Sequence, residues 1–177
     1  MEQQLSDSMK AILIKIALEL KRLGWKSDSQ TNEIDVFQGH LGMYKNTEWR
    51  GEQWRGNGPG ELPDVQIDIS IDMSFAQNEQ NGVYFLVFNE SYSLSVDGAS
   101  GSEKQEQSDL SIDFSEADAN NIAKIQQAAK ELNEHVQGNV DEHGYEYAQE
   151  SYADWKDYNA SGTAYADKAE PWKDDNY

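Results

Sequence analysis

The stretch VQIDISIDMSF at residues 65–75 decides the fold of this chain. Its odd-numbered positions are all apolar, and the even-numbered positions between them are all Gln, Asp or Ser. Because successive side chains of a strand point to opposite faces, this pattern predicts a strand with one buried and one exposed face. Polar residues 77–82 supply a turn, and a second apolar run extends from Val83 to Val96. Together the two segments predict an antiparallel hairpin at the centre of the fold.

Apolar residues also recur at three- and four-residue steps on either side of this hairpin. The first series covers residues 5–23 and predicts an amphipathic helix that stops at Gly24, with Trp25 folded back onto the core. A second helix is expected to start at Ser115, a good N-terminal cap, and to end at Gly138. Its apolar positions are Ile122, Ile125, Ala129, Leu132 and Val136.

Shorter alternating segments predict the remaining strands. Residues 33–37 are expected to form the first strand, with residues 40–44 as its extension or hairpin partner, and residues 109–114 the last. The segments 47–63 and 97–107 are polar and rich in glycine or proline, which is typical of loops. We therefore predict an α+β fold, in which an antiparallel sheet of four to five strands carries the N-terminal helix and the second helix on one face.

We expect residues 1–138 to form this α+β domain and residues 139–177 to form an acidic aromatic C-terminal segment. The segment interleaves tyrosine and tryptophan with carboxylates and has few aliphatic residues. Residues 141–158 have the spacing of a short helix, and the rest is expected to be extended. Segments of this composition often order only on a partner, although the aromatic side chains could instead pack on the domain.

Charge is the main compositional feature, with 14 basic and 33 acidic residues and a net charge of −19. Residues 1–55 contain eight of each sign, so the whole excess lies in residues 56–177. Such a surface attracts basic proteins and repels nucleic acid and anionic lipid. Solubility or salt adaptation would also explain it. Because there is no cysteine, no signal-peptide pattern and no long apolar run, we expect a cytoplasmic protein that does not enter a membrane.

Catalytic and ligand-binding motifs are absent from the sequence. It has no P-loop, no dinucleotide fingerprint and no nucleophile elbow. His135 and His143 are eight residues apart, whereas a metal-binding His-Glu-x-x-His helix uses a step of four. We therefore expect no metal, no cofactor and no enzymatic activity. An unrecognised acidic active site is the remaining alternative, and it would require two carboxylates that converge in a pocket.

The polar face of the predicted sheet carries regularly spaced carboxylates. Same-face neighbours on a strand are ~6.7 Å apart, so a four-residue step spans ~13 Å, a multiple of the phosphate spacing along a nucleic acid. We expect a non-enzymatic inhibitor of a basic nucleic-acid-binding protein or nuclease, with DNA mimicry of the anti-restriction, anti-CRISPR or immunity type as the finer hypothesis and a phage or host-defence context. The alternative is that these carboxylates only solvate the face and bind no partner. The candidate residues are Asp68, Asp72, Asp97, Asp109 and Asp113.

A second hypothesis places the binding surface elsewhere. Tryptophan and arginine dominate interface hot spots, and the 47–63 segment contains two Trp-Arg pairs. These pairs and the aromatic tail would bind a partner subunit, unless the indoles plug the open end of the sheet. The candidate residues are Trp49, Arg50, Trp54, Arg55, Tyr152 and Trp155. Neither hypothesis identifies the partner or the oligomeric state.

Overall fold

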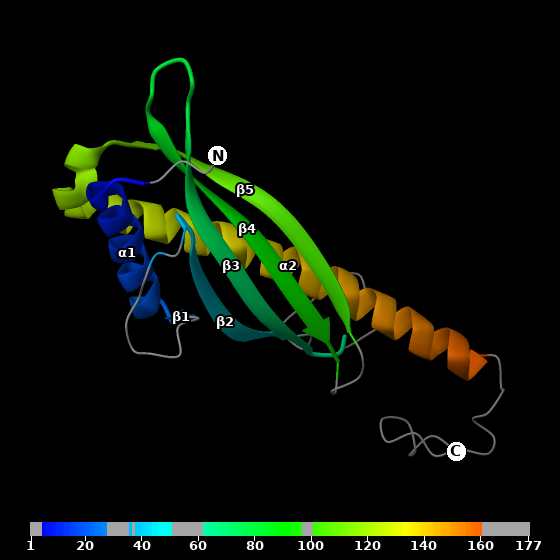
Figure 1. The fold of residues 1–177 in the computed structure, drawn as a ribbon. Coiled ribbons are helices and arrows are strands. Elements are labelled where there is room, and N and C mark those ends of the chain that lie inside the picture. Colours follow the sequence, from blue (N-terminus) through cyan, green and yellow to red (C-terminus); the bar gives the residue numbers. More distant parts are fainter. Residues whose placement is uncertain (1–4, 28–35, 37, 51–61, 97–100, 161–177) are drawn as a thin grey trace.

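A computed structural model describes residues 5–27, 36, 38–50, 62–96 and 101–160, without the side chains of residues 152–160 (Figure 1). The chain begins with a helix, continues through the strands of one sheet and ends, in the described part, with a second and much longer helix. The elements are α1 (Asp7–Arg22), β1 (Lys26–Ser27), β2 (Leu41–Trp49), β3 (Val65–Gln77), β4 (Tyr84–Ser95), β5 (Ser102–Phe114), the 3-10 helix η2 (Glu116–Asn120) and α2 (Ile122–Ala160).

The five strands form one antiparallel sheet in the order β1-β2-β3-β4-β5. Each strand pairs with the next along the chain, so every connection is a hairpin or a longer return to the neighbouring position. The register places Ser70 of β3 between Tyr44 of β2 and Ser91 of β4, and Ser91 pairs in turn with Gln105 of β5. Side chains of like character therefore line up across the sheet in rows.

Both helices cover the same face of the sheet (Figure 1). The apolar residues of β3, from Val65 to Met73, are at most 2% exposed, and they pack in one core with the apolar stripes of α1 and α2. The opposite face, called the outer face below, carries no described helix. This arrangement confirms the predicted α+β class and the predicted placement of both helices. None of the described helices is long and apolar enough to cross a membrane.

Helix α1 follows its sequence pattern closely. The Ser6 hydroxyl accepts a hydrogen bond from the backbone N–H of Met9, which satisfies one of the free donors at the helix start. Gly24 takes a φ of +99° just past the helix end, the left-handed conformation that glycine adopts without strain. Trp25 is 2% exposed and donates from Nε1 to Oδ1 of Asn133 at 2.9 Å, which confirms its predicted return to the core.

Two segments predicted as loops contain strand. β2 continues to Trp49, into the segment 47–63, because residues 47–49 pair with residues 65–67 of β3. β5 begins at Ser102, inside the predicted loop 97–107, because its first half pairs with β4. That half lacks the apolar alternation of a half-buried strand, since its inward residues include Lys104, Glu106 and Ser108. The predicted first strand at 33–37 lies outside the described residues except for Val36, which belongs to no element.

The start of the second helix also differs from the prediction. Ser115 caps the 3-10 helix η2, and Asp118 accepts hydrogen bonds from the Ser115 backbone and from Lys124. Burial opposes ionisation of Asp118, but these hydrogen bonds outweigh it and lower the pKa of that carboxyl. Ile122, expected in the apolar stripe, is 68% exposed at the first position of α2. The other four predicted stripe positions are buried.

The predicted helix end at Gly138 is wrong, because α2 continues through it to Ala160. The buried stripe persists beyond that point with Val140, His143 and Ala148, so contact with the sheet sustains the helix where propensity alone would end it. The predicted helix at 141–158 is therefore part of one 39-residue helix that spans the expected domain boundary. The end of α2 extends past the strands (Figure 1).

Gly144 of α2 lies directly against Trp49, and this contact can be tested with a matched pair of alanine variants. A Cβ on Gly144 would lie 2.5 Å from Cγ of Trp49, whereas a Cβ on Gly138 would have nothing within 4 Å. Gly144→Ala should destabilise the protein by about 1–3 kcal/mol through overpacking. Gly138→Ala should stabilise it by about 0.5–1 kcal/mol through helix propensity. Urea unfolding measures both, and stabilisation by both variants would contradict the Trp49–α2 packing.

Candidate functional site

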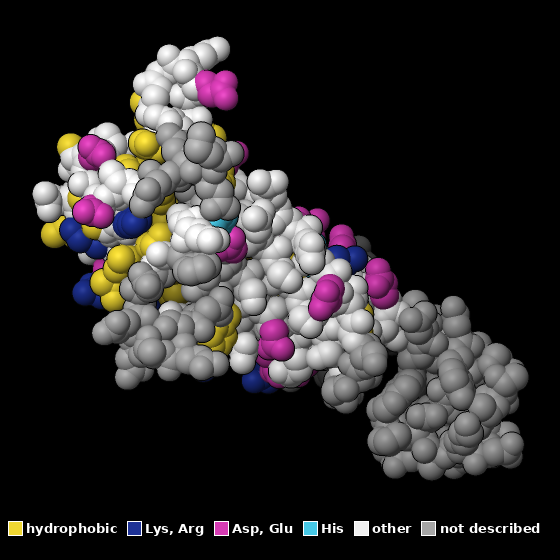
Figure 2. All heavy atoms as spheres, viewed as in Figure 1, with side chains coloured by type: hydrophobic (Ala, Val, Ile, Leu, Met, Phe, Trp, Pro, Cys, Tyr) yellow, Lys and Arg dark blue, Asp and Glu magenta, His cyan; other side chains and the backbone are white. Residues whose placement is uncertain are grey.

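The outer face of the sheet is largely polar, and its formal charges on β2, β3, β4 and β5 are negative. Lys26 of the edge strand β1 pairs with Tyr44 and also alternates onto this face. The residues of β2, β3, β4 and β5 that alternate onto it include serines, asparagines, glutamines and carboxylates but no lysine or arginine. Figure 2 shows this face as a mainly uncharged surface with separate acidic patches. Its carboxylates in the described strands are Glu48, Asp68, Asp72, Glu103, Asp109 and Asp113.

The structure brings four of the five predicted aspartates onto this one face. Asp68 and Asp72 belong to β3, and Asp109 and Asp113 belong to β5, two strands away. Strands are ~4.8 Å apart, so the two pairs lie on strands separated by ~10 Å. Asp97, the fifth candidate, lies outside the described residues.

The spacing of these carboxylates is wider than that of nucleic-acid phosphates. A DNA duplex carries about one charge per 1.7 Å of its axis. A 13-residue strand such as β3 spans ~44 Å, a length that corresponds to about 25 phosphates. The described strands β2 to β5 place six carboxylates on the outer face over that length. Hydroxyl and amide groups fill the positions between them, so hydrogen bonding is as prominent on this face as charge.

Asp72 has a histidine partner on the outer face. Its Oδ2 lies 2.9 Å from Nδ1 of His40, and the two side chains are 45% and 49% exposed. At this exposure an ion pair contributes at most about 1 kcal/mol, so the contact orients the carboxylate more than it stabilises the fold.

A hollow of about 680 Å³ opens on the outer face beside Asp72. Its floor and walls come from adjacent rows of four strands, and their outward side chains are hydroxyls, amides and one carboxylate. Glu90 and Glu106 also border it, but their side chains point to the opposite face, as strand alternation requires. The outward residues are Gly42, Ser70, Asp72, Asn89, Ser91, Gln105 and Gln107.

The Trp-Arg candidates do not form an exposed pair at the end of β2. Trp49 is 6% exposed and packs beneath α2, with its ring centroid 6.3 Å from that of Tyr145. Trp49 is therefore not available as an exposed interface residue, and it agrees with the alternative in which the indole packs against the sheet. The Arg50 Nε lies 2.7 Å from Oε1 of Glu48.

The remaining candidates of the second hypothesis are not placed by the structure. Trp54 and Arg55 lie outside the described residues. Tyr152 and Trp155 belong to the helix α2, and their side chains are likewise not described.

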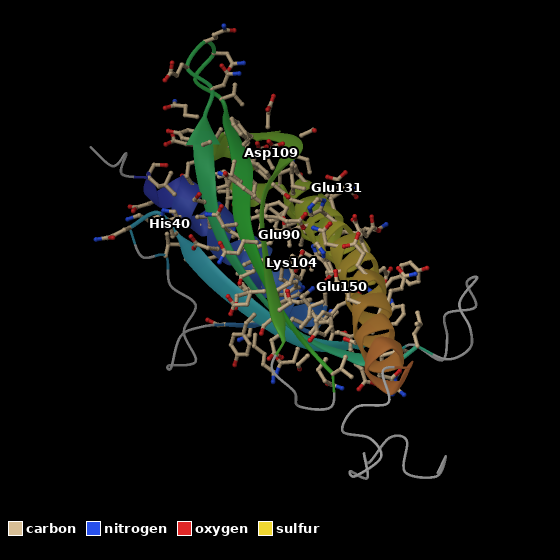
Figure 3. The ribbon with its side chains drawn as sticks, turned by 90° about the vertical axis from the view of Figure 1, so that its right-hand side faces the viewer. His40, Glu90, Lys104, Asp109, Glu131 and Glu150 are labelled. Atoms are coloured by element: carbon tan, nitrogen blue, oxygen red, sulfur yellow. The ribbon has the colours of Figure 1, made fainter. Side chains whose placement is uncertain are left out.

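A buried polar cluster, which the sequence analysis did not identify, lies on the other face between the sheet and α2. The Glu90 side chain has no exposed surface, and Tyr92 donates a hydrogen bond to its Oε1 at 2.5 Å. Ser108 donates to Oε2 at 2.6 Å, and Asn139 of α2 donates to Oε1 at 2.9 Å. Figure 3 shows Glu90 on the side of the sheet toward α2 and His40 on the opposite side. Three donors therefore satisfy this buried carboxylate.

Two histidines of α2 extend this cluster. Nε2 of His135 lies 2.9 Å from the Ser108 hydroxyl and 3.4 Å from Oε2 of Glu90. About two turns further along α2, Nε2 of His143 lies 3.2 Å from Oε2 of Glu106, and the His143 ring contacts that of Tyr92. Within the described part of the chain, Nδ1 of His143 is the buried side-chain polar atom without a hydrogen-bond partner.

The cluster is not arranged for nucleophilic catalysis. In a serine–histidine–acid triad the serine and the carboxylate contact different nitrogens of the histidine ring. The carboxylate then orients the ring while the histidine accepts the serine proton. Here Ser108 and Glu90 both approach Nε2 of His135, and Ser108 donates directly to the carboxylate. Metal binding is not favoured either, because the described residues contain no group of three or more His, Asp or Glu placed to hold an ion.

A sequence signal for the buried cluster exists but is weak. Glu90 occupies an inward position of β4 between Phe88 and Tyr92, where the alternation calls for an apolar residue. A carboxylate at such a position requires buried donors, and the histidines and asparagine at four-residue steps on α2 supply the matching polar stripe. The pairing of strand and helix that joins them is a tertiary feature and has no local pattern.

Removal of the Glu90 carboxylate tests the cluster. Glu90→Ala leaves Tyr92, Ser108 and Asn139 without their acceptor and opens a cavity, so it should destabilise the protein by about 3 kcal/mol or more. Glu103→Ala, on the exposed face of β5, should change the free energy of unfolding by less than about 0.5 kcal/mol. Chemical denaturation compares the two variants. Equal small effects would show that the Glu90 hydrogen bonds contribute nothing to stability.

Tyr92 makes the stability of the folded protein depend on pH in the alkaline range. Burial and, next, the hydrogen bond to Glu90 raise the pKa of this phenol well above its ordinary value. The neutral Tyr92 phenol contributes fully to the free energy of unfolding below its unfolded-state pKa of ~10. This contribution is lost as the pH rises above that value, because Tyr92 then ionises in the unfolded chain and not in the folded one.

Absorbance titration measures this effect. At pH ~11 the folded wild type and Tyr92→Phe should show equal phenolate amplitudes. In denaturant the wild type should show one phenolate more than the variant. A difference of one phenolate in the folded state would contradict the raised pKa of Tyr92.

Comparison with protein-family models, with curated proteins and with solved structures finds no match to this chain.

Proposed function

We propose that this chain is a non-enzymatic binding protein whose outer sheet face binds a basic partner protein. The observation that carries the proposal is the acidic character of that face: its described positions on β2, β3, β4 and β5 include six carboxylates and no lysine or arginine, and Lys26 lies at its edge, on β1. The net charge of −19 adds long-range attraction to any basic surface. Rigid strands hold these groups in fixed rows, which favours recognition over mere solubility.

A nucleic-acid-binding protein or nuclease is the partner class that this face fits best. The nucleic-acid groove of such a protein presents lysine and arginine side chains that already bind phosphates, and the same side chains accept carboxylates. By occupying that groove the chain would block access of DNA or RNA and so inhibit the partner. The carboxylates are too sparse to reproduce every phosphate, so the mimicry would be partial, with serine and amide groups supplying short-range contacts.

The buried cluster supports a binding role rather than a catalytic one. Glu90 is the carboxylate with the most specialised surroundings, and its side chain is fully enclosed by Tyr92, Ser108 and Asn139. A general acid or base must reach the substrate within hydrogen-bond distance. Glu90 instead links β4, β5 and α2, which holds the sheet in the shape that displays the outer face.

Charge reversal on the outer face tests the proposal. The triple change Asp68→Lys, Asp72→Lys and Asp113→Lys should abolish capture of basic proteins from a lysate of the native host cell, because attraction becomes repulsion. The matched control is Glu134→Lys, Glu142→Lys and Glu146→Lys, which changes the net charge equally at exposed positions of α2. Mass spectrometry identifies captured proteins, and those with a pI above about 9 should be retained by wild type and by the control.

The outcomes separate the alternatives. Captured partners should dissociate as salt rises from about 0.05 to 0.5 M, and duplex DNA should compete for them. Equal losses in both triple variants would mean that net charge alone, and not the outer face, determines binding. Loss of capture in Trp54→Ala with retention in the outer-face variant would instead support a partner-subunit interface formed by the Trp-Arg segment and the aromatic tail.

A further inference from the structure

The hollow beside Asp72 results from a pattern of side-chain sizes in two neighbouring rows of the sheet. In the row through Ser70 the central residues of β3 and β4 are both serine, and in the next row β2 contributes Gly42 opposite Asp72. Longer side chains surround these small ones. They are Asp72 and Asn89 on the inner strands and Gln105 and Gln107 on β5. Small residues at the centre and amides at the rim make a concave site on an otherwise pleated face.

The chemistry of the hollow favours a hydrogen-bonding cation. Asp72 supplies the one outward carboxylate, and its contact with His40 orients Oδ2. The carbonyl oxygens of Asn89, Gln105 and Gln107 and the hydroxyls of Ser70 and Ser91 are further acceptors. No lysine or arginine lines the hollow among the described residues to compete for these groups. The volume of about 680 Å³ is ample for one long side chain.

We propose that this hollow receives an arginine side chain of the basic partner, with the guanidinium against Asp72 and its remaining N–H groups on the surrounding amide and hydroxyl oxygens. The inference rests on the proposed function and specifies its central contact. Arginine fits better than lysine because its planar fork directs five donors to several acceptors at once, whereas an ammonium group is a compact point charge. The other carboxylates of the face then steer the partner, and Asp72 anchors it.

The first experiment compares two peptide probes on the intact chain. Nona-arginine and nona-lysine carry the same charge, and each is titrated into the ¹⁵N-labelled full-length protein at about 0.15 M salt. We expect nona-arginine to bind at least about tenfold more tightly and to shift the side-chain amide signals of Asn89, Gln105 and Gln107. Equal affinity of the two peptides, or amide shifts confined to residues outside the hollow, would overturn the inference.

Three variants locate the contact. Asp72→Asn should weaken nona-arginine binding about tenfold or more, whereas Asp113→Asn, an equal loss of charge on the same face, should weaken it about twofold or less. Ser91→Gln leaves the net charge unchanged but fills the floor of the hollow. This variant should therefore bind nona-arginine and nona-lysine with equal affinity. Equal effects of the two aspartate variants, or a preference unchanged in Ser91→Gln, would overturn the inference. Backbone amide spectra confirm that each variant is folded.

The two levels of the proposal fail differently. If both peptides bind equally and every loss of a carboxylate weakens them alike, the face is a diffuse electrostatic surface: the arginine site is wrong and the proposed function stands. If neither peptide binds and the outer-face triple variant still captures the same basic proteins, both the arginine site and the proposed function are wrong.

Discussion

The alternation of apolar and polar side chains along β3 is the constraint on which the rest of the structure depends. From Val65 to Met73 every second side chain is apolar and buried, and each fully buried aliphatic side chain contributes about 1.5–3 kcal/mol. A one-residue slip in register would place all of these side chains in water and all of the aspartates and serines in the core. The helices α1 and α2 must therefore cover one face, and the polar face carries no described helix.

Burial of Glu90 is the exception to this separation, and it accounts for several other features. A carboxylate within the apolar layer requires donors, which Tyr92, Ser108 and Asn139 provide from three elements. The first half of β5 is polar on its inward side because it borders this cluster. α2 likewise extends beyond Gly138 because its later turns still contact the sheet, through His143 on Glu106 and Gly144 on Trp49. Polar contacts on the inward side of the sheet thus involve both a strand, β5, and a helix, α2.

The parts of the fold that depend on local periodicity were predictable from the sequence. The alternation of residues 65–75 predicted β3, its hairpin with β4 and the two-faced sheet, and the stripe of residues 5–23 predicted α1. The errors fall where tertiary contact overrides local preference. Gly138 is a good helix stop in isolation, but α2 continues because its later turns contact the sheet. Trp49 precedes a glycine-rich segment, but its ring packs under α2. Four predicted aspartates share the outer face as expected, whereas the hollow depends on registration across four strands, which the sequence of a single strand does not contain.

The position of β5 as the last strand of the sheet has a consequence for how this protein coexists with others. Within the described chain no strand pairs with its outer edge, so 13 residues of backbone could accept a foreign strand. Charged side chains on both faces of β5 oppose this: Glu103, Asp109 and Asp113 on one side, Lys104 and Glu106 on the other. Such charges are a recognised protection against edge-to-edge aggregation. The open edge of this sheet therefore carries its own barrier to the addition of a foreign strand, because such a strand would have to approach charges on both faces of β5.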